Sequence, residues 1–282
     1  MHWKLATLNA LERAAGLARR AGLGAVVDRL APVMGRPFER FSLEVDGVRL
    51  GGTTLAQLHY VRELLEGRDR TLVRLLAEAV PEGGTVLEGG AYLGFVTIHA
   101  ARAAGPHGRV VAFEPNAEVH GLLRENLAAN GVADCVSVVP KALGETSGTA
   151  RFYVREDTSS LVDVATDARP VEIDVVRGDD EVPGPVDVVK LDVEGSEAAA
   201  LRGLDRLLAS PAPPSVIFVE CFPRLLESAG SSGEELMSLL ESSGYRVEWI
   251  DETAGATAPL SRPWSEDYVN LRCEYGPGDA DL

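Results

Sequence analysis

The chain has 282 residues, of which 45% are hydrophobic and 25% charged, a composition that suits one large α/β domain with an appendage. The formal net charge of −16, with no more than two Lys or Arg residues in succession, argues against a nucleic-acid partner. Three widely spaced cysteines without a C-x-x-C pair argue against a disulfide framework and against a structural zinc site.

The compartment is predicted from what the sequence lacks. No segment approaches about 18 uncharged apolar residues, the length that a membrane-spanning helix needs. Glu12, Arg13, Arg19 and Arg20 interrupt the region where a signal peptide would have an apolar core. We therefore expect a cytoplasmic protein without membrane insertion.

Residues 1–80 are expected to form a mostly helical N-terminal cap. Apolar residues recur at helical spacing over 5–30 and again over 55–80. Between them, residues 41–50 alternate like a hairpin around Asp46-Gly47. This region is predicted to serve as a lid or as the contact of a homodimer, and a helix packed on its own domain is an equal alternative.

From residue 81 onward, strands and helices alternate, which predicts a parallel sheet covered on both faces, with ligands at the carboxyl ends of its strands. Residues 149–176 interrupt this order with two strands around the polar stretch E-D-T-S-S-L-V-D, and we expect an insertion near the mouth of the site. The last two strands suit an antiparallel pair. The predicted strands are 85–88, 109–114, 136–139, 186–192, 215–220, 245–250 and 268–273, and the predicted helices are 95–104, 118–130, 197–209 and 234–242.

The glycine-rich loop V-L-E-G-G-A-Y-L-G-F, residues 86–95, follows the first of these strands. Its glycines do not fit the G-x-G-x-x-G spacing of a dinucleotide fold. Glu88 would repel a diphosphate, whereas it could accept hydrogen bonds from an ammonium group, directly or through a water. A ligand that joins an amino-acid head to a nucleoside satisfies both conditions, and S-adenosylmethionine is such a ligand.

Glu114 ends the next strand, about twenty residues after the loop, where an acid can bind both ribose hydroxyls. Proteins that bind NAD use the same device. Glu114 is therefore compatible with either cofactor, and the distinction rests on Glu88.

Several motifs together resemble the FkbM family of S-adenosylmethionine-dependent methyltransferases over roughly residues 81–250. They are V-L-E-G-G-A-Y-L-G-F-V-T, G-R-V-V-A-F-E-P-N, V-V-P-K-A-L-G and V-V-K-L-D-V-E-G-S-E. The resemblance implies a Rossmann-like fold with a seven-stranded, mostly parallel sheet and helices on both faces. It also implies O-methylation of a hydroxyl on a sugar or a polyketide-type natural product, with some relatives acting on nitrogen or carboxylate groups.

The predicted cofactor-binding residues follow from these motifs. The chain departs from the family pattern at Glu88 and Tyr92, where Asp and Asn are usual, and Lys141 stands near the position from which relatives present an acid to the adenine. Backbone contacts from Lys141 or Ala142 would survive that change. The full predicted set is Glu88, Gly90, Ala91, Tyr92, Gly94, Thr97, Glu114, Pro115, Asn116, Lys141, Ala142 and Asp192.

The catalytic residues are expected among the acids that end the fourth and fifth strands. Methyl transfer from a sulfonium requires alignment, and a hydroxyl acceptor must also lose its proton to a nearby base. We expect Asp192, Glu194 or Glu220 to be that base, in this order, whereas Glu197 is expected to be a charge at a helix N-terminus. The same three acids could instead hold Mg²⁺.

Two other classes of function stay open at this point. A nicotinamide-dependent oxidoreductase would use Glu114 on the ribose, but Glu88 and the glycine spacing oppose it. A non-catalytic module that binds the cofactor without turnover is also compatible with the loop. The predicted partner is a small-molecule acceptor.

Overall fold

The computed structural model describes residues 41–154, 161, 169–260 and 268–276. The predicted helix over 5–30 and most of the polar stretch within the insertion lie outside the described residues. The chain divides into two compact units, Met1–Arg68 and Asp69–Leu282. The second unit therefore begins before the boundary expected at residue 81.

The first unit contains a β-hairpin and a helix. Strands β1 (Phe41–Val45) and β2 (Val48–Gly52) pair antiparallel, and every second residue of β1 is buried. Asp46 and Gly47 join them with φ of 45° and 78°, the conformation that a two-residue hairpin turn requires. Helix α3 (Leu55–Leu65) follows, and a capping box between Thr54 and Gln57 starts it.

The helical spacing expected over 55–80 corresponds to two helices in the structure. Helix α3 ends at Leu65 and helix α4 spans Arg70–Ala79. Between them Gly67 and Asp69 have positive φ, 107° and 58°, which is incompatible with a continuous α-helix. Helix α4 belongs to the second unit.

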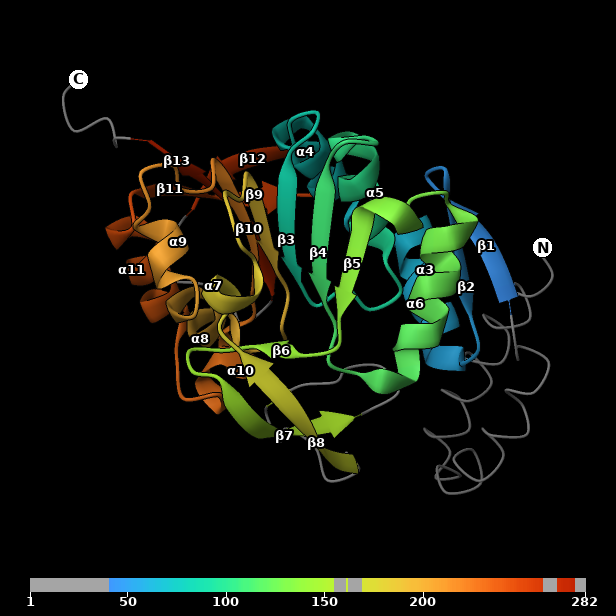
Figure 1. The fold of residues 1–282 in the computed structure, drawn as a ribbon. Coiled ribbons are helices and arrows are strands. Elements are labelled where there is room, and N and C mark those ends of the chain that lie inside the picture. The colour runs from blue at the N-terminus through green and yellow to red at the C-terminus, as the bar shows by residue number, and fades with distance from the viewer. Residues whose placement is uncertain (1–40, 155–160, 162–168, 261–267, 277–282) are drawn as a thin grey trace, which may run out of the picture. The chain divides into compact units, whose positions relative to one another are not determined.

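The second unit is built on an eight-stranded sheet with the order β12-β11-β13-β10-β9-β3-β4-β5 (Figure 1). The five strands from β10 to β5 are parallel, and β13 and β11 close the sheet as the expected antiparallel pair. The eighth strand, β12, is an added edge strand paired with β11. The strands are β3 (Thr85–Gly89), β4 (Arg109–Phe113), β5 (Val136–Val139), β9 (Val188–Leu191), β10 (Val216–Cys221), β11 (Tyr245–Asp251), β12 (Ala256–Pro259) and β13 (Val269–Tyr275).

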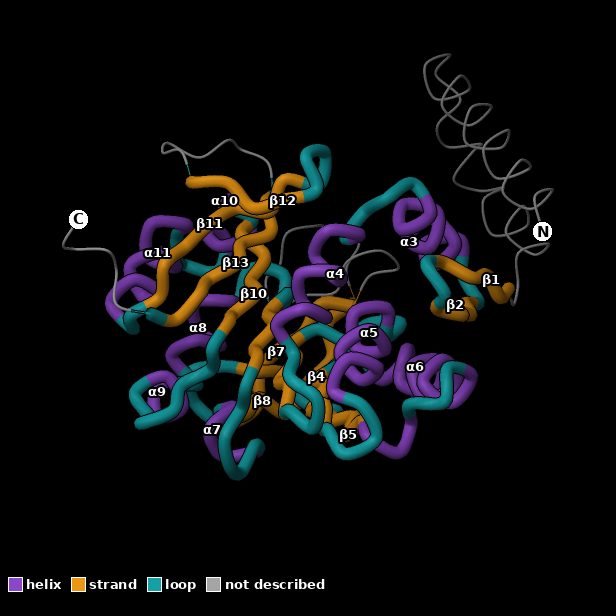
Figure 2. Tube along the Cα trace, turned by 90° about the horizontal axis from the view of Figure 1, so that it is seen from above, coloured by secondary structure: helices purple, strands orange, loops and turns teal. Residues whose placement is uncertain are grey.

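Helices cover both faces of this sheet, as Figure 2 shows from above. Helices α4, α5 (Phe95–Ala104) and α6 (Ala117–Ala129) lie on one face, and α8 (Glu197–Arg202) and α11 (Gly233–Ser242) lie on the other. Buried aliphatic residues such as Leu87, Val189 and Ile217 form one core cluster with Leu201 and Leu240 of the second face. Truncating one such leucine to Ala typically costs about 2–5 kcal/mol.

The helix expected over 197–209 is interrupted, so the prediction of one continuous helix there is wrong. Helix α8 ends at Arg202, and the short helix α9 spans Asp205–Leu208. A Cβ atom on Gly203 would lie 2.1 Å from the carbonyl oxygen of Gly144, so the chain between the two helices touches another backbone. The turn at Gly203 is thus set by a tertiary contact that the local sequence does not reveal.

The insertion contributes β7 (Gly148–Val154) and β8 (Arg169–Val176) to a separate three-stranded sheet, whose third strand is β6 (Ala142–Leu143). The two insertion strands, both expected from the sequence, pair antiparallel with each other. A Cβ atom on Gly89 would lie 2.9 Å from Cδ1 of Leu143, so β6 lies against the carboxyl end of β3. Figure 1 shows the small sheet beyond the carboxyl ends of β3 and β4.

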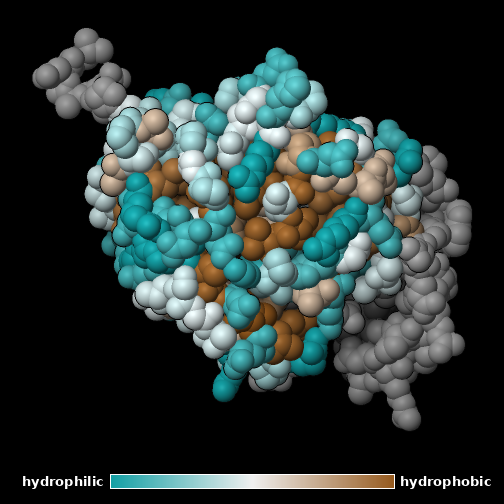
Figure 3. Space-filling model, viewed as in Figure 1, coloured by the Kyte–Doolittle hydropathy of each residue, from teal (hydrophilic) through white to brown (hydrophobic). Residues whose placement is uncertain are grey.

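Three short helices complete the described elements: the 3-10 helix at Ala133–Cys135, α7 (Gly178–Glu181) and α10 (Pro223–Ser228). In the view of Figure 3, hydrophobic residues gather over the central strands, with hydrophilic residues around them. Among the described residues, no helix is both long and apolar enough to cross a membrane.

Candidate functional site

The glycine-rich loop is folded tightly against the ends of β4 and β9. The backbone N–H groups of Gly90 and Ala91 donate to the carbonyl oxygen of Phe113 at 2.9 and 3.2 Å. Gly90 has φ of 84°, and a Cβ atom there would lie 1.8 Å from the carbonyl oxygen of Asp192. Only glycine fits this position, because both the backbone conformation and the space exclude a side chain.

Glu88 is the last residue but one of β3, and its carboxyl group is buried, with an exposed fraction of 1%. Burial raises its pKa to about 7, although the nearby Lys190 ammonium and, more weakly, the Thr97 hydroxyl lower it. The Thr97 hydroxyl lies close enough to Glu88 to lower its pKa, but neither this hydroxyl nor a carboxylate oxygen of Glu88 reaches hydrogen-bond geometry with any group in the part of the chain that the structure describes. Two unpartnered polar groups therefore lie beneath the glycine loop, which is unusual in a folded protein.

Glu114 follows β4 and holds the loop from its other side. One carboxylate oxygen accepts the Tyr92 N–H at 2.8 Å, and the other accepts the Asn116 N–H at 2.8 Å. Burial raises the pKa of Glu114 to about 7, against the lowering effect of these two hydrogen bonds. Tyr92 itself has φ of 46°, so this loop conformation is one that a non-glycine residue seldom adopts.

Asp192 follows β9 and forms an ion pair with Lys190. The Lys190 ammonium donates to a carboxylate oxygen of Asp192 at 3.0 Å, with 4% of the lysine and 31% of the aspartate side chain exposed. Burial lowers the pKa of Lys190, but Asp192 and Glu88 outweigh it and raise the pKa overall. The lysine is thus a buried cation between two carboxyl groups of the site.

Three further acids surround Asp192. Glu194 is half-buried and has φ of 53°. Glu197, in the first turn of α8, accepts the N–H groups of Val193 and Gly195 at 2.9 and 3.1 Å, so it holds the loop after β9 from beneath. Burial raises the pKa of Glu197 to about 7.

Glu220 lies in β10 with an exposed fraction of 7%. Burial and the negative charges of Asp192, Glu194 and Glu197 raise its pKa well above the ordinary value. The three predicted catalytic acids therefore lie together at the carboxyl ends of β9 and β10, although their side chains differ in exposure.

The remaining predicted residues have mainly local contacts. The side chain of Asn116 accepts the Glu118 N–H and caps α6. The ammonium of Lys141 forms an ion pair with Glu181 at 2.5 Å, so its side chain is engaged within the protein. Ala142 is buried in β6, Pro115 is half-buried, and Gly94 has φ of 89° where α5 begins.

Sequence reasoning missed Lys190 and the way in which Glu197 supports the loop. A signal for Lys190 exists, because it lies two residues before Asp192 in a strand, and such residues share a face. In addition, Lys190 pairs in register with Glu88 of the neighbouring strand. That pairing could not be read from the sequence.

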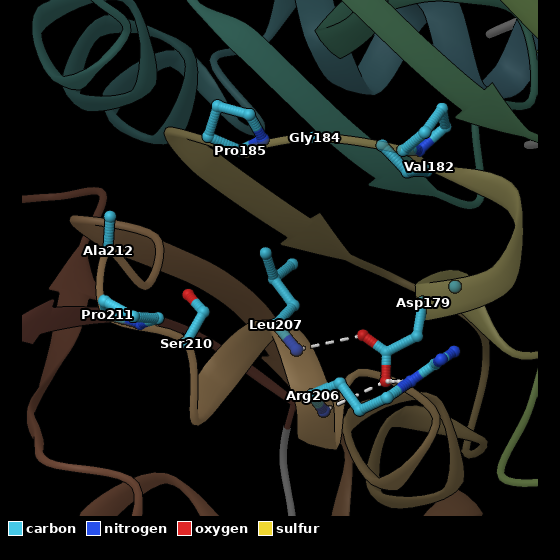
Figure 4. A pocket seen from close by; sticks show the side chains of 11 residues that line it. Asp179, Val182, Gly184, Pro185, Arg206, Leu207, Ser210, Pro211 and Ala212 are labelled. Atoms are coloured by element: carbon cyan, nitrogen blue, oxygen red, sulfur yellow. Dashed lines mark hydrogen bonds and ion pairs between the residues drawn. The ribbon is translucent and has the colours of Figure 1, made fainter.

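A surface cavity of about 400 Å³ lies elsewhere, at the amino ends of β9 and β10 (Figure 4). Its walls include Asp179, Pro185, Arg206 and Ser210. Asp179 accepts the N–H groups of Arg206 and Leu207 at 3.0 Å each, so it caps α9 and is already satisfied. None of the predicted site residues lines this cavity.

The residues present do not favour a metal centre. Within the described residues, no three His, Cys, Asp or Glu side chains are grouped so that they could hold a metal ion. The Mg²⁺ site considered for Asp192, Glu194 and Glu220 therefore has no support in the geometry.

Known proteins resemble this chain in sequence and fold. An arginine N(omega)-methyltransferase from Streptomyces achromogenes subsp. streptozoticus is 27% identical over 120 residues, covering 42% of this chain but only 33% of that protein. The hexuronic acid methyltransferase AglP of Haloferax volcanii is 28% identical over 174 residues, covering 59% and 69%. A crystal structure of methyltransferase FkbM from Methylobacillus flagellatus KT covers 79% of this chain and 63% of that one, with 15% identity and a TM-score of 0.44.

A family model described as the methyltransferase FkbM domain matches residues 88–247, from the acid before the glycine loop to the strand β11. This match covers more than half of the 282 residues. The chain therefore belongs to the FkbM methyltransferase domain family.

Proposed function

We propose that the protein transfers the methyl group of S-adenosylmethionine to a hydroxyl group of a sugar or natural-product small molecule. The observation that carries this proposal is Glu88, a buried carboxyl group without a hydrogen-bond partner in the described part of the chain, directly before a glycine loop. An ammonium group satisfies such a carboxyl, whereas a diphosphate does not. The methionine end of the cofactor carries that ammonium.

The cofactor site would be formed by the ends of β3 and β4. Glu88 and Thr97 would hold the methionine ammonium. Because their oxygens are buried, a bridging water would make the contact where the ammonium cannot reach them directly. Glu114, which keeps the loop in place through Tyr92, would accept the ribose hydroxyls. The Lys141 side chain is already paired with Glu181. The proposed contact with the adenine would therefore come from the backbone of Lys141 and Ala142. When bound, the cofactor supplies an activated methyl group on a sulfonium.

Asp192 is the proposed base for the acceptor hydroxyl. Its carboxylate is partly exposed and is directed by the ion pair to Lys190, so it can meet a ligand in a fixed orientation. Glu220 is less suited to accept a proton, because burial and the neighbouring negative charges raise its pKa well above the ordinary value and favour its protonated form. Glu194 is the second candidate.

N-methylation is a second candidate function. It is favoured by the similarity to a relative whose name is arginine N(omega)-methyltransferase. A protonated guanidine or amine must lose a proton before it can attack the methyl group, so Asp192 would keep the role of base. Homodimer formation through residues 1–80 and a cytoplasmic location stay predictions.

Calorimetric titration with S-adenosylhomocysteine and, separately, with NAD tests the cofactor. We expect binding of the homocysteine nucleoside and none of NAD. Replacing Glu88 with Gln should weaken S-adenosylhomocysteine binding by roughly 1–3 kcal/mol, the contribution of a hydrogen bond to a charged group. Glu82→Gln, at an exposed residue before β3, is the matched control and should bind normally.

Labelled methyl donor and a panel of sugars, polyketides and guanidine compounds then test turnover. Transfer to a hydroxyl acceptor supports the proposal, and transfer only to nitrogen supports the second candidate. NAD binding without binding of the homocysteine nucleoside would contradict both. Cofactor binding without transfer to any compound of the panel would favour a non-catalytic module.

A further inference from the structure

Glu220 occupies a position that the cofactor residues do not reach. The neighbouring strands run in the order β10-β9-β3-β4 (Figure 1), and the proposed cofactor residues follow β3 and β4. Lys190 of β9 pairs in register with Glu88 on one side and with Phe218 on the other. Glu220 lies two residues beyond Phe218, so it shares their face and lies nearer the carboxyl edge. A group bound at Glu220 would therefore be a neighbour of the cofactor and not part of it.

The charge around Glu220 is unbalanced. Asp192, Glu194 and Glu197 all repel its ionised form, and the nearby Lys190 ammonium already donates to Asp192 at 3.0 Å. Glu220 is more than nine-tenths buried, with an exposed fraction of 7%. A buried carboxyl in this state gains a large interaction from a positively charged ligand, since the nearest cation in the described part of the chain, Lys190, already donates to Asp192.

Two aromatic rings lie at the same edge. Phe222 directly follows β10, and Tyr268 directly precedes β13. The neighbouring residues Cys221 and Val269 are paired in the register of these two strands, so the two aromatic residues lie opposite each other. The ring centroids are 6.4 Å apart with planes inclined by 58°, and 44% of Tyr268 is exposed. By register the two rings lie on the face that carries Glu220. Aromatic faces attract cations, so the rings complement a buried carboxylate in the recognition of a positive group.

We propose that the methyl acceptor carries a protonated amine or guanidinium, and that Glu220, flanked by Phe222 and Tyr268, binds this positive group. When it binds, Glu220 releases its proton to solvent and the carboxylate pairs with the cation. Asp192 then lies one strand away, next to the group that receives the methyl. The inference rests on the proposed function, because it assigns the substrate class of the same site.

The test compares matched cationic and neutral compounds on protein saturated with S-adenosylhomocysteine. Arginine is paired with citrulline, and glucosamine with glucose, in calorimetric titrations up to millimolar concentrations. We expect the cationic member of at least one pair to bind tenfold or more tightly, which is roughly 1.4 kcal/mol, and to release a proton. The proton appears as a dependence of the heat on the ionisation enthalpy of the buffer.

Variants assign the preference to Glu220. In Glu220→Gln the preference should disappear, whereas in Glu227→Gln, at an exposed residue of α10, it should persist. Tyr268→Leu, at a half-exposed ring, should reduce it by a smaller factor, roughly two- to fivefold. The preference should also survive raised salt, because a buried pair is screened much less than a surface charge.

The outcomes separate this inference from the proposed function. Failure of S-adenosylhomocysteine to bind the unmodified protein would contradict the proposed function. Normal cofactor binding without a preference for the cationic compounds would overturn only the inference. The same holds if none of the four compounds binds. A preference that persists in Glu220→Gln would overturn it as well, provided that this variant binds S-adenosylhomocysteine and is therefore folded.

Discussion

The buried carboxyl of Glu88 should make the protein less stable as pH rises, and Glu88→Gln should remove that loss. Glu88 has an exposed fraction of 1% and no hydrogen-bond partner within the described residues, so its ionised form is poorly solvated. Glutamine has nearly the shape of the protonated side chain and does not ionise. The variant therefore isolates the cost of the charge from the cost of a cavity.

The sign follows from the pKa of Glu88, which burial raises from its ordinary value of 4.5 to about 7. Below the lower value the carboxyl is protonated in both the folded and the unfolded chain. Between the two values the unfolded chain releases its proton while the folded chain retains it, so the free energy of unfolding falls as pH rises. Above about pH 7 both states are ionised and the loss is constant, at about 3 kcal/mol.

Urea denaturation at about pH 5 and about pH 8 measures the effect. We expect Glu88→Gln to be more stable than the unmodified protein, with a difference that grows by about 2–3 kcal/mol between the two pH values. Glu114 and Glu197 have similarly raised pKa values but are present in both proteins, so most of their effect cancels in the difference; the Glu88 charge contributes to the pKa of Glu114 less than burial and the two backbone hydrogen bonds do. The exposed Glu82→Gln should show no such growth.

A stability difference that does not change with pH would refute this reasoning, because it would mean that Glu88 is ionised without penalty in the folded protein. The proposed function adds a second requirement. The same variant that is more stable alone should gain less stability from S-adenosylhomocysteine, since the ligand stabilises only in proportion to its affinity.

Other variants test other parts of the site. Gly90→Ala would place a Cβ atom 1.8 Å from the carbonyl oxygen of Asp192, so calorimetry should detect no binding of S-adenosylhomocysteine. Gly121→Ala is the control and should bind normally, because nothing lies within 4 Å of its new Cβ atom. Glu197→Gln keeps the shape of the side chain but weakens the acceptor for two loop N–H groups. Methyl transfer should therefore slow by roughly tenfold, which corresponds to about 1.4 kcal/mol. An unchanged kcat/KM would contradict the supporting role of Glu197. Lys190→Met leaves buried carboxylates without their cation. The free energy of unfolding, measured by urea denaturation, should fall by about 3–5 kcal/mol at about pH 8 and by less at about pH 5. An equal fall at both pH values would mean that Lys190 contributes through packing alone.

The sequence by itself determined the alternation of strands and helices in the second unit, and it led to the prediction that the glycine-rich loop binds a cofactor. Alternating apolar runs located the parallel strands, because a strand buried on both faces must be nearly all apolar. The acid before the glycines and the acid that ends β4 could be predicted as a pair, since parallel strands bring their carboxyl ends to one edge. Those residues are local in sequence, and their meaning depends only on the strand that each one ends.

The tertiary structure decided what depends on distant partners. Gly203 has no room for a side chain because the backbone of Gly144 approaches it, and the local sequence does not reveal that contact. Lys190 became part of the site through its register with Glu88, which follows from the order of the strands in the sheet. The charge states of Glu88 and Glu220 were likewise invisible in the sequence, because burial and neighbouring charges set them, and both arise only when the chain is folded.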